Sequence, residues 1–418
     1  MMEKVSLWKA STASGAIGSI LAGDQKAQFV VVGGGFTGVS TALHLALTGA
    51  SVILLEANQI GFGGSGRNVG YVNAGLWLVP DKVDALLGKE WGDRLYYSLA
   101  AAPQRVFELI EQYGIDCEAT RNGTLHVAVG KSGQRQLQDR ISQLSARGAP
   151  VELLNATETS ARIGSSYFSA SLFDPRAGTI QPLAYVRGLA QAACTLGVQI
   201  HENTPVNTLS RSKDGWRIIT SSGSVTAEQV VLATNAYSGN RFSGLEKSFV
   251  PIYYSQLASE PLTAAQREQV LPNKEGAWDT CTVMSSFRLD QKGRFIIGGM
   301  GCESDALTPW GDNRVKKWFP SLGKLKWQYA WSGRIAFSDD HVPHFHQLDE
   351  GLYSLIGYSG RGIAPGTKLG QCLAQWLTGD RDSMPLPLTP LKETSCRWLK
   401  AAFYDIGARV YHLGQRVL

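Results

Sequence analysis

Hydrophobic positions near the start of the chain follow two different periods, and the change between them predicts two strands and a helix. A continuous apolar run at 29–32 is typical of a buried parallel strand, and residues 39–47 follow with the apolar spacing of a helix. A second apolar run covers 51–55. This order of strand, helix and strand is typical of the first unit of a dinucleotide-binding sheet.

The pattern returns later in the chain after two interruptions. Helical patterns at 91–113 and 134–147 flank a strand expected at 124–129, which indicates an insertion of the kind that covers a ligand. From 249 to 330, short strand-like pieces alternate with turns, as in an antiparallel sheet. We therefore predict an α/β fold in which a Rossmann-like nucleotide-binding domain is interleaved with a mainly antiparallel, α+β substrate domain.

Changes in the pattern also predict where the domains begin and end. The expected parts are an N-terminal arm (1–27), the nucleotide-binding domain in three segments (28–76, 154–245 and 331–380), a helical substrate-domain insertion (77–153), the main substrate domain (246–330) and a helical C-terminal tail (381–418). Small residues at 11–19 argue against a packed element in the arm. A helix expected at 396–417 is basic, and docking on its own domain is a simpler interpretation than contact with a membrane.

Composition is typical of a soluble globular protein. The chain has 418 residues, of which 44% are hydrophobic and 18% charged, and a formal net charge of +5. Because the basic residues are dispersed, we expect no nucleic-acid partner. No apolar run reaches the roughly 20 residues that span a bilayer, and the first residues do not form a signal-peptide pattern. The six cysteines form no C-x-x-C pair, so we expect reduced thiols and a cytoplasmic protein without a transmembrane segment.

Three glycines between the first strand and the first helix form the motif G-x-G-x-x-G. Gly33 permits a tight turn, Gly35 lets the backbone approach a pyrophosphate, and Gly38 lets the helix pack closely on the strand. The phosphates would meet free N–H groups and the positive end of the helix dipole. Glu56 ends the second strand, where a carboxylate accepts hydrogen bonds from ribose hydroxyls and repels the 2′-phosphate of NADP. The motif alone does not separate FAD from NAD.

A second glycine-rich turn occurs in the last quarter of the chain. A strand expected at 352–356 leads into GYSGRGIAP at 357–365, and a helix is expected at 367–377. The positive end of this helix can face the electron-rich edge of a reduced flavin around N1 and O2. This turn is therefore a candidate contact for a flavin.

Taken together, the motifs resemble those of the FAD-dependent amine and amino-acid oxidases of the D-amino-acid oxidase, glycine oxidase and sarcosine oxidase type. The resemblance covers about residues 28 to 380. Its segments are VVVGGGFTGVSTALHLA with Glu56, GFGGSGRN, AGTIQPLAYVRGLA, VVLATNAYSG, W-S-G-R with D-x-x-P, and GYSGRGIAPGTKLG. Within the family, GFGGSGRNVGYVNAGLW and LKAAFYDIGARVYHL are most similar to bacterial L-pipecolate oxidases. Gamma-glutamylputrescine oxidases share G-F-G-x-S-G-R-N.

The resemblance implies that FAD is the cofactor and is bound without a covalent link. Covalent members of the family use a cysteine in the C-terminal half, whereas this chain has no cysteine near 339–342. The implied cofactor contacts are Gly33, Gly35, Phe36, Thr37 and Gly38 at the pyrophosphate, Glu56 at the ribose, Ser65, Arg67 and Asn68 at the ribityl chain and flavin, Val206 at the adenine, Ala233 and Thr234 at the diphosphate, and Gly360, Arg361, Gly362 and Ile363 at the pyrimidine end, with Ala57 and Gly66 completing the set.

A substrate carboxylate needs a cationic or hydroxyl partner in a buried site. Related oxidases hold the carboxylate with arginines of the two C-terminal segments, but here each arginine is displaced by one residue from the glycine oxidase pattern, and in a strand such a shift reverses the face. Arg67 is a reserve candidate, and contact with the flavin is the alternative for each arginine. The expected substrate-binding residues are Arg334, Arg361, Tyr253, Tyr254 and Trp77.

The implied chemistry is transfer of a hydride from a neutral amine to flavin N5, with no obligatory catalytic side chain. Dioxygen then takes up the electrons and yields hydrogen peroxide. For L-pipecolate the product is Δ1-piperideine-6-carboxylate, in lysine breakdown. Three alternatives remain: a gamma-glutamylputrescine oxidase, an amine dehydrogenase that passes electrons to a quinone, and a non-catalytic flavoprotein subunit.

Three histidines near the second glycine-rich turn form H-x-x-H-x-H. His341, His344 and His346 could suggest a metal, but Pro343 interrupts them and no cysteine or carboxylate cluster joins them. A surface or cofactor-side strand is the simpler interpretation. We therefore expect no metal site.

Overall fold

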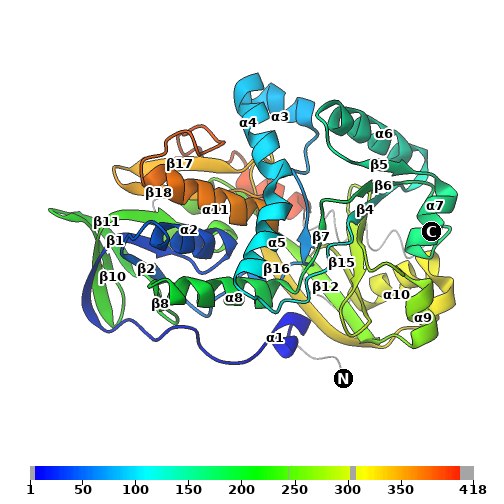
Figure 1. Cartoon of the computed structure of the whole chain (residues 1–418), viewed down its shortest axis with the longest axis horizontal. Helices are drawn as coiled ribbons and strands as arrows, with labels where there is room; N and C mark the ends of the chain where they lie inside the picture. The colour runs from blue at the N-terminus through cyan, green and yellow to red at the C-terminus, as the bar shows by residue number, and fades with distance from the viewer. Residues whose placement is uncertain (1–4, 243, 302–306, 405–418) are drawn as a thin grey trace.

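The computed structural model describes residues 5–242, 244–301 and 307–404, and its strands form two large sheets that lie side by side (Figure 1). The first sheet has a parallel centre. In spatial order its strands are β17 (His344–Asp349), β18 (Leu352–Ile356), β11 (Gly223–Leu232), β1 (Gly23–Val32), β2 (Val52–Leu55) and β8 (Gln199–His201), with β10 (Gly215–Ile219) and β9 (Thr208–Ser212) attached along β11. The pairs from β18 to β8 are all parallel, which confirms the predicted Rossmann-like sheet.

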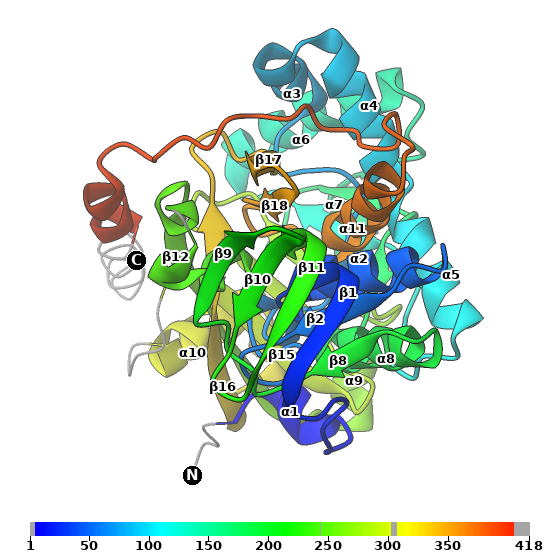
Figure 2. The ribbon, with the colours of Figure 1, turned by 90° about the vertical axis from the view of Figure 1, so that its left-hand side faces the viewer.

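Strand β11 has different neighbours along its length. Its first half forms a hairpin with β10 and its last residues pair with β18, while β1 runs parallel to it along nearly its whole length. Figure 2 shows β9, β10 and β11 extending from the parallel part of the sheet.

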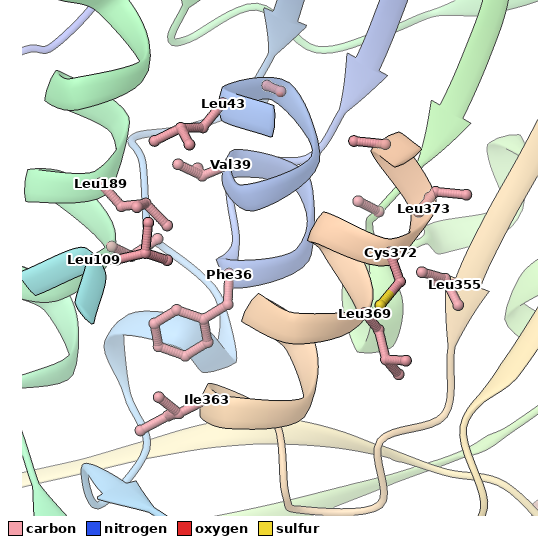
Figure 3. Close-up of a cluster of buried hydrophobic side chains, with 14 of the residues drawn as sticks. Phe36, Val39, Leu43, Leu109, Leu189, Leu355, Ile363, Leu369, Cys372 and Leu373 are labelled. Atoms are coloured by element: carbon pink, nitrogen blue, oxygen red, sulfur yellow. The ribbon is translucent and has the colours of Figure 1, made fainter. Parts of the chain in front are cut away.

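Helices pack on the parallel strands and form the largest buried apolar cluster described here. They are α2 (Phe36–Ala46), α5 (Ala102–Gln112), α8 (Pro182–Thr195) and α11 (Ile363–Leu377). In Figure 3, Val39 and Leu43 of α2 point toward Leu189 of α8. Each of these side chains is fully buried, which stabilises the fold by about 1.5–3 kcal/mol per residue.

The contact between α2 and α11 is close because α11 presents glycine to its neighbour. A Cβ atom on Gly370 would lie 2.7 Å from the carbonyl oxygen of Thr37 and 2.9 Å from the Cβ of Ser40. The hydroxyl of Ser40 donates to the carbonyl of Thr367 at 2.6 Å. The two helices are therefore held together with their first turns at the same edge of the sheet.

The second sheet is antiparallel except where β13 and β4 pair in parallel, in agreement with the predicted substrate domain. In spatial order its strands are β16 (Trp327–Phe337), β12 (Val250–Pro261), β15 (Arg294–Met300), β14 (Ser285–Leu289), β13 (Gly276–Asp279), β4 (Thr124–Val127), β6 (Ser171–Asp174) and β5 (Glu152–Leu154), and a small separate pair is β3 (Tyr71–Val72) with β7 (Gly178–Thr179). The remaining helices are α1 (Leu7–Ser11), α3 (Pro80–Leu87), α4 (Lys89–Ala100), α6 (Gly130–Ala146), α7 (Ala156–Ile163), α9 (Ala264–Gln269) and α10 (Leu307–Trp318), with short 3₁₀ turns η1 (Gly64–Gly66), η2 (Asn235–Tyr237), η3 (Gly239–Arg241), η4 (Leu245–Lys247) and η5 (Pro320–Leu322).

Sheet membership changes at positions that differ from the expected domain boundaries. The boundary expected at 331 falls inside β16, which pairs with β12 as far as Phe337. β6, which follows the boundary expected at 154, pairs with β4 of the antiparallel sheet. In both places the chain passes from a strand of the antiparallel sheet toward a segment of the parallel sheet. The composition of the chain therefore gives no signal for the passage from one sheet to the other.

Two expected elements also differ locally. The helix expected over 91–113 is two helices, α4 and α5, because Pro103 lies in the first turn of α5 and disfavours helical continuation through the preceding residue. The arm before β1 is packed at α1, where Leu7 and Trp8 are buried. The indole Nε1 of Trp8 donates to the carbonyl of Asn68 at 2.8 Å, so the arm supports the loop that follows β2.

The C-terminal segment is helical at 397–404, and the rest of the helix expected at 396–417 lies outside the described residues. The side chains of Trp398 and Phe403 are exposed. Among the described helices, none has the length and apolar character needed to cross a bilayer.

Candidate active site

A cavity of about 900 Å³ lies where the parallel sheet meets the antiparallel sheet. Gly33, Glu56 and Ala233, which follow β1, β2 and β11, line it on the side of the first sheet. Tyr254 and Trp278 line it from β12 and β13. The carboxyl ends of parallel strands meet at one edge, where doubly wound sheets bind nucleotides. The cavity thus joins the expected cofactor edge to the expected substrate sheet.

The first glycine turn leaves a cradle that a side chain would fill. Gly33 has a φ of +113°, and a Cβ there would lie 2.8 Å from the carbonyl oxygen of Ala233. A Cβ on Gly35 would lie 2.9 Å from the hydroxyl of Ser65. No side chain caps the N-terminus of α2 from its N-cap position. This combination of open backbone and a positive helix end fits a diphosphate.

Glu56 has a second role that the sequence did not indicate. Its carboxylate accepts the backbone N–H of Gly34 at 2.7 Å and that of Asn58 at 2.8 Å. Burial raises the pKa of Glu56, these N–H groups lower it, and the charge of Glu202 adds to the rise. The same carboxylate that is expected to bind ribose therefore also holds the glycine turn in place.

The second glycine-rich turn approaches the same cavity. Gly360, Gly362 and Ile363 line it, and Gly360 has a φ of +93°. The hydroxyl groups of Tyr358 and Thr37 lie 2.7 Å apart, which ties this turn to the start of α2. Two helix N-termini therefore reach one cavity. This arrangement fits a long cofactor that places one anionic group at the start of α2 and another at the start of α11.

The loop after β2 is held largely by its own backbone. Asn68 donates to the carbonyls of Gly64 and Ser65 at 3.0 and 2.9 Å, and the hydroxyl of Ser65 accepts the N–H of Phe36 at 3.1 Å. Arg67 donates to the carbonyls of Phe62 and Ser332 at 2.9 and 3.1 Å and lies beside the cavity. These bonds shape the wall of the cavity and leave Arg67 less suited to bind a substrate carboxylate.

Most of the expected cofactor residues line the cavity. They are Gly33, Gly35, Phe36, Thr37, Glu56, Ala57, Ser65, Arg67, Asn68, Val206, Ala233, Thr234, Gly360, Arg361, Gly362 and Ile363. Gly38 and Gly66 do not line it. A Cβ on Gly38 would lie 2.0 Å from the carbonyl oxygen of Gly33, and one on Gly66 would lie 2.2 Å from that of Gly61. These two glycines permit close packing behind the cradle.

Arg361 is the substrate candidate with the most unusual surroundings. Its guanidinium lies over the rings of Trp77 and Trp278, at 4.7 and 5.5 Å from the centroids, and donates to the carbonyl of Ala74 at 2.7 Å. Among the described residues, none accepts a hydrogen bond from its Nε. Burial, and after it the charge of Arg140, lowers the pKa of Arg361 to about 9. A buried cation in this state is stabilised by an anionic ligand.

The other substrate candidates are placed differently. The guanidinium of Arg334 lies 4.4 Å from the ring centroid of Tyr237, whose hydroxyl accepts the Arg334 backbone N–H at 3.0 Å. Tyr254 lines the cavity and donates to the hydroxyl of Ser286 at 2.7 Å, whereas Tyr253 does not line it. Arg334 thus faces the wall formed by η2, beside the loop that contains η1.

The sequence did not indicate several of the residues that line the cavity, and Arg140 and His126 are the two that bear on its charge. Arg140 of α6 donates through Nη2 to the carbonyl of Trp77, and burial lowers its pKa to about 10. His126 of β4 stacks on Trp278 at 5.2 Å. Burial, and then the charges of Arg140 and Arg361, hold the pKa of His126 well below its ordinary range. The only sequence signal for either residue was the insertion that carries them.

The three histidines of the H-x-x-H-x-H motif have different surroundings. His344 Nε2 lies 3.0 Å from Asp340 Oδ1, His346 Nδ1 lies 2.8 Å from the carbonyl of Thr389, and His341 lines the cavity. Across the described part of the chain there is no group of three or more His, Cys, Asp or Glu residues able to hold a metal ion.

Comparison with known proteins shows the class to which this fold and cavity belong. The model of a family described as FAD dependent oxidoreductase matches residues 28–376, so the chain belongs to this family. It is an FAD-dependent amine or amino-acid oxidoreductase.

Individual relatives are similar over most of the chain, and a solved structure has a similar fold. The protein called probable oxidoreductase OrdL from Haemophilus influenzae is 30% identical over 87% of this chain and 85% of its own length. Gamma-glutamylputrescine oxidoreductase from Escherichia coli is 30% identical over 93% of this chain and 92% of its own. The crystal structure of glycine oxidase from Geobacillus kaustophilus has a TM-score of 0.72 and 21% identity, covering 84% of this chain and 94% of that one.

Proposed function

We propose that this protein oxidises an amine that carries a carboxylate, and that L-pipecolate is the first candidate substrate. The observation that supports this most directly is Arg361, a buried guanidinium at the cavity that forms no ion pair with a carboxylate in the described chain. An arginine binds a carboxylate through two charge-assisted hydrogen bonds. L-Pipecolate offers that carboxylate beside a secondary amine.

In the proposed reaction, the carbon beside the amine nitrogen loses a hydride and the nitrogen loses a proton, so that the amine becomes an imine. Bound FAD supplies the hydride acceptor. For L-pipecolate the product is Δ1-piperideine-6-carboxylate. Arg361 would orient the carboxylate, while Trp77 and Trp278 would enclose the ring and exclude water. The neutral His126 adds a polar wall without a competing charge.

Gamma-glutamylputrescine is the second candidate substrate. The relative from Escherichia coli that carries this name is similar over nearly its full length. This substrate also has a carboxylate, and its imine product would give an aldehyde and ammonia after hydrolysis. The volume of the cavity, about 900 Å³, must hold the cofactor as well as substrate, so a linear substrate would have to extend along it.

A substrate panel tests the proposal. FAD-loaded protein would be mixed without oxygen with L-pipecolate, D-pipecolate, piperidine, gamma-glutamylputrescine and putrescine, and bleaching of the yellow flavin absorbance would be followed. We expect fast bleaching by a carboxylated amine and slow bleaching by the counterpart that lacks the carboxylate. If piperidine or putrescine bleaches the flavin as fast as the carboxylated compounds, the proposal is wrong.

The electron acceptor is tested in the same samples. We propose that dioxygen restores the flavin colour and is reduced to hydrogen peroxide. Recovery with a quinone but not with air would identify a dehydrogenase instead. Absence of bleaching with every amine would favour a non-catalytic flavoprotein subunit.

A further inference from the structure

Arg140 and Arg361 converge on the same tryptophan from distant parts of the chain. Arg140 donates to the Trp77 carbonyl, and Arg361 stacks on the Trp77 ring at 4.7 Å. Both arginines line the main cavity, and both also line a smaller cavity of about 50 Å³ next to it. Each residue keeps part of its surface accessible, and both line these cavities.

No acid of the described chain neutralises this pair. Asp174, the carboxylate whose charge acts on Arg361, is already bound by Arg176, with Nε to Oδ1 at 2.9 Å and Nη2 to Oδ2 at 2.7 Å. Asp139, which acts on Arg140, is exposed on α6. Two like charges that line the same cavity raise the free energy of the empty protein, and an anion bound by both would lower it.

We propose that Arg140 is a second carboxylate-binding residue, and that it and Arg361 hold one substrate carboxylate between helix α6 and the turn before α11. This inference rests on the proposed function, because it names the group of the substrate that the site selects. The planar guanidinium groups suit the two oxygens of a carboxylate. Trp77 fixes the relative position of both arginines through its carbonyl and its ring.

The placement of Arg140 would let α6 help to select substrates that carry a carboxylate. Helix α6 follows β4 within the insertion at 77–153, whereas Arg361 follows β18 of the nucleotide-binding sheet. A carboxylate bound by both arginines would bridge the two halves of the cavity wall. An amine without that group would lack the bridge and would bind with less defined orientation.

The test uses FAD-loaded protein and an unreactive probe. Picolinate carries a carboxylate on a flat ring and pyridine is the same ring without it. Dissociation constants for both would be measured from the change in flavin absorbance, in the wild type, Arg140→Gln, Arg361→Gln and the double variant. Arg135→Gln is the matched control, because Arg135 is an exposed arginine of the same helix. Melting temperature and FAD content would verify folding.

We expect each single substitution to weaken picolinate binding by about tenfold or more, with pyridine unchanged and Arg135→Gln equal to wild type. If one carboxylate contacts both arginines, the loss in the double variant should be smaller than the product of the single losses. Arg140→Lys keeps the charge without the planar fork and should give an intermediate loss, which also covers the case in which Arg140→Gln does not fold.

Unchanged picolinate affinity in Arg140→Gln, or equal weakening of picolinate and pyridine, would overturn the proposal. Multiplicative losses would mean that the arginines bind different groups, and a dicarboxylate that binds more tightly than picolinate would then be expected. The outcome is separable from the proposed function, because picolinate binding is measured without turnover. Failure of every carboxylated amine to bleach the flavin would refute that function while leaving the anion site measurable.

Discussion

Glu56 holds Gly34 through a 2.7 Å hydrogen bond from the glycine N–H to the carboxylate. The bond links the end of β2 to the turn after β1, so the residue expected to bind the ribose also shapes the expected diphosphate cradle. Substitution of a carboxylate with both roles should therefore weaken FAD binding more than substitution of one that contacts the cofactor alone.

Glu56→Ala should therefore weaken FAD binding without changing substrate preference. The variant loses hydrogen bonds to a charged group, each worth about 1.5–3 kcal/mol, and frees the glycine turn. The measurement is the dissociation constant of FAD together with the ranking of substrates at saturating FAD. Excess FAD should restore activity. A normal FAD affinity with an altered substrate ranking would contradict this placement of the cofactor.

The sequence predicts the two glycine-rich turns at the cavity because their determinants are local. The glycines of the first turn and Glu56 lie at fixed offsets from one strand and one helix, and the strand expected at 352–356 is observed as β18 with the same limits. In each case the apolar period and the neighbouring glycines carry the information.

The sequence predicts the residues on the substrate side of the cavity less well, because this side depends on contacts between segments far apart in the chain. Arg140 lies on a helix whose sequence reads as an amphipathic surface element, and only its contact with Trp77 brings it to the cavity. The sequence also did not show which way the Arg361 side chain points. A displacement by one residue reverses the side-chain direction in a strand, but Arg361 lies between β18 and α11, where side chains do not alternate between two faces.

FAD should be released by acid. Among the described residues that line the cavity, the one cysteine is Cys281, and there is no cysteine at 339–342, where the family resemblance would place a covalent attachment. Precipitation of the protein with acid should leave the yellow colour in the supernatant. A yellow pellet that survives washing would show a covalent link.

Stability should fall below neutral pH through His44. Its Nδ1 lies 2.7 Å from the carbonyl of Ser40 and its Nε2 lies 3.0 Å from Arg105, an arrangement that requires the neutral ring. Burial lowers the pKa of His44 from 6.5 to about 4. The unfolded chain takes up the proton first, so this contribution is complete above pH 6.5 and is lost as the pH falls toward 4. The expected loss between pH 7 and pH 5 is about 2 kcal/mol.

Urea unfolding of the wild type and of His44→Gln at both pH values measures this contribution. Glutamine retains an acceptor for Arg105 but does not titrate. The variant should be less stable than the wild type at pH 7, and the gap should narrow by about 2 kcal/mol at pH 5. A constant gap would mean that His44 does not account for the acid sensitivity.

Arg334 and Arg361 should respond differently to two substrates that differ only in the carboxylate. Neither arginine forms an ion pair with an acid of the described chain, but Arg361 lies at the aromatic wall, whereas Arg334 stacks on Tyr237 beside the loop that contains η1. We expect Arg361→Ala to cost the turnover of L-pipecolate at least about 2 kcal/mol in kcat/KM and to leave the slow reaction of piperidine nearly unchanged. Arg334→Ala should reduce both reactions by a similar factor, because it alters the cofactor side of the cavity. The opposite result would be a selective loss of L-pipecolate turnover in Arg334→Ala and an equal loss of both reactions in Arg361→Ala. It would show that Arg334 binds the carboxylate and that Arg361 lies on the cofactor side.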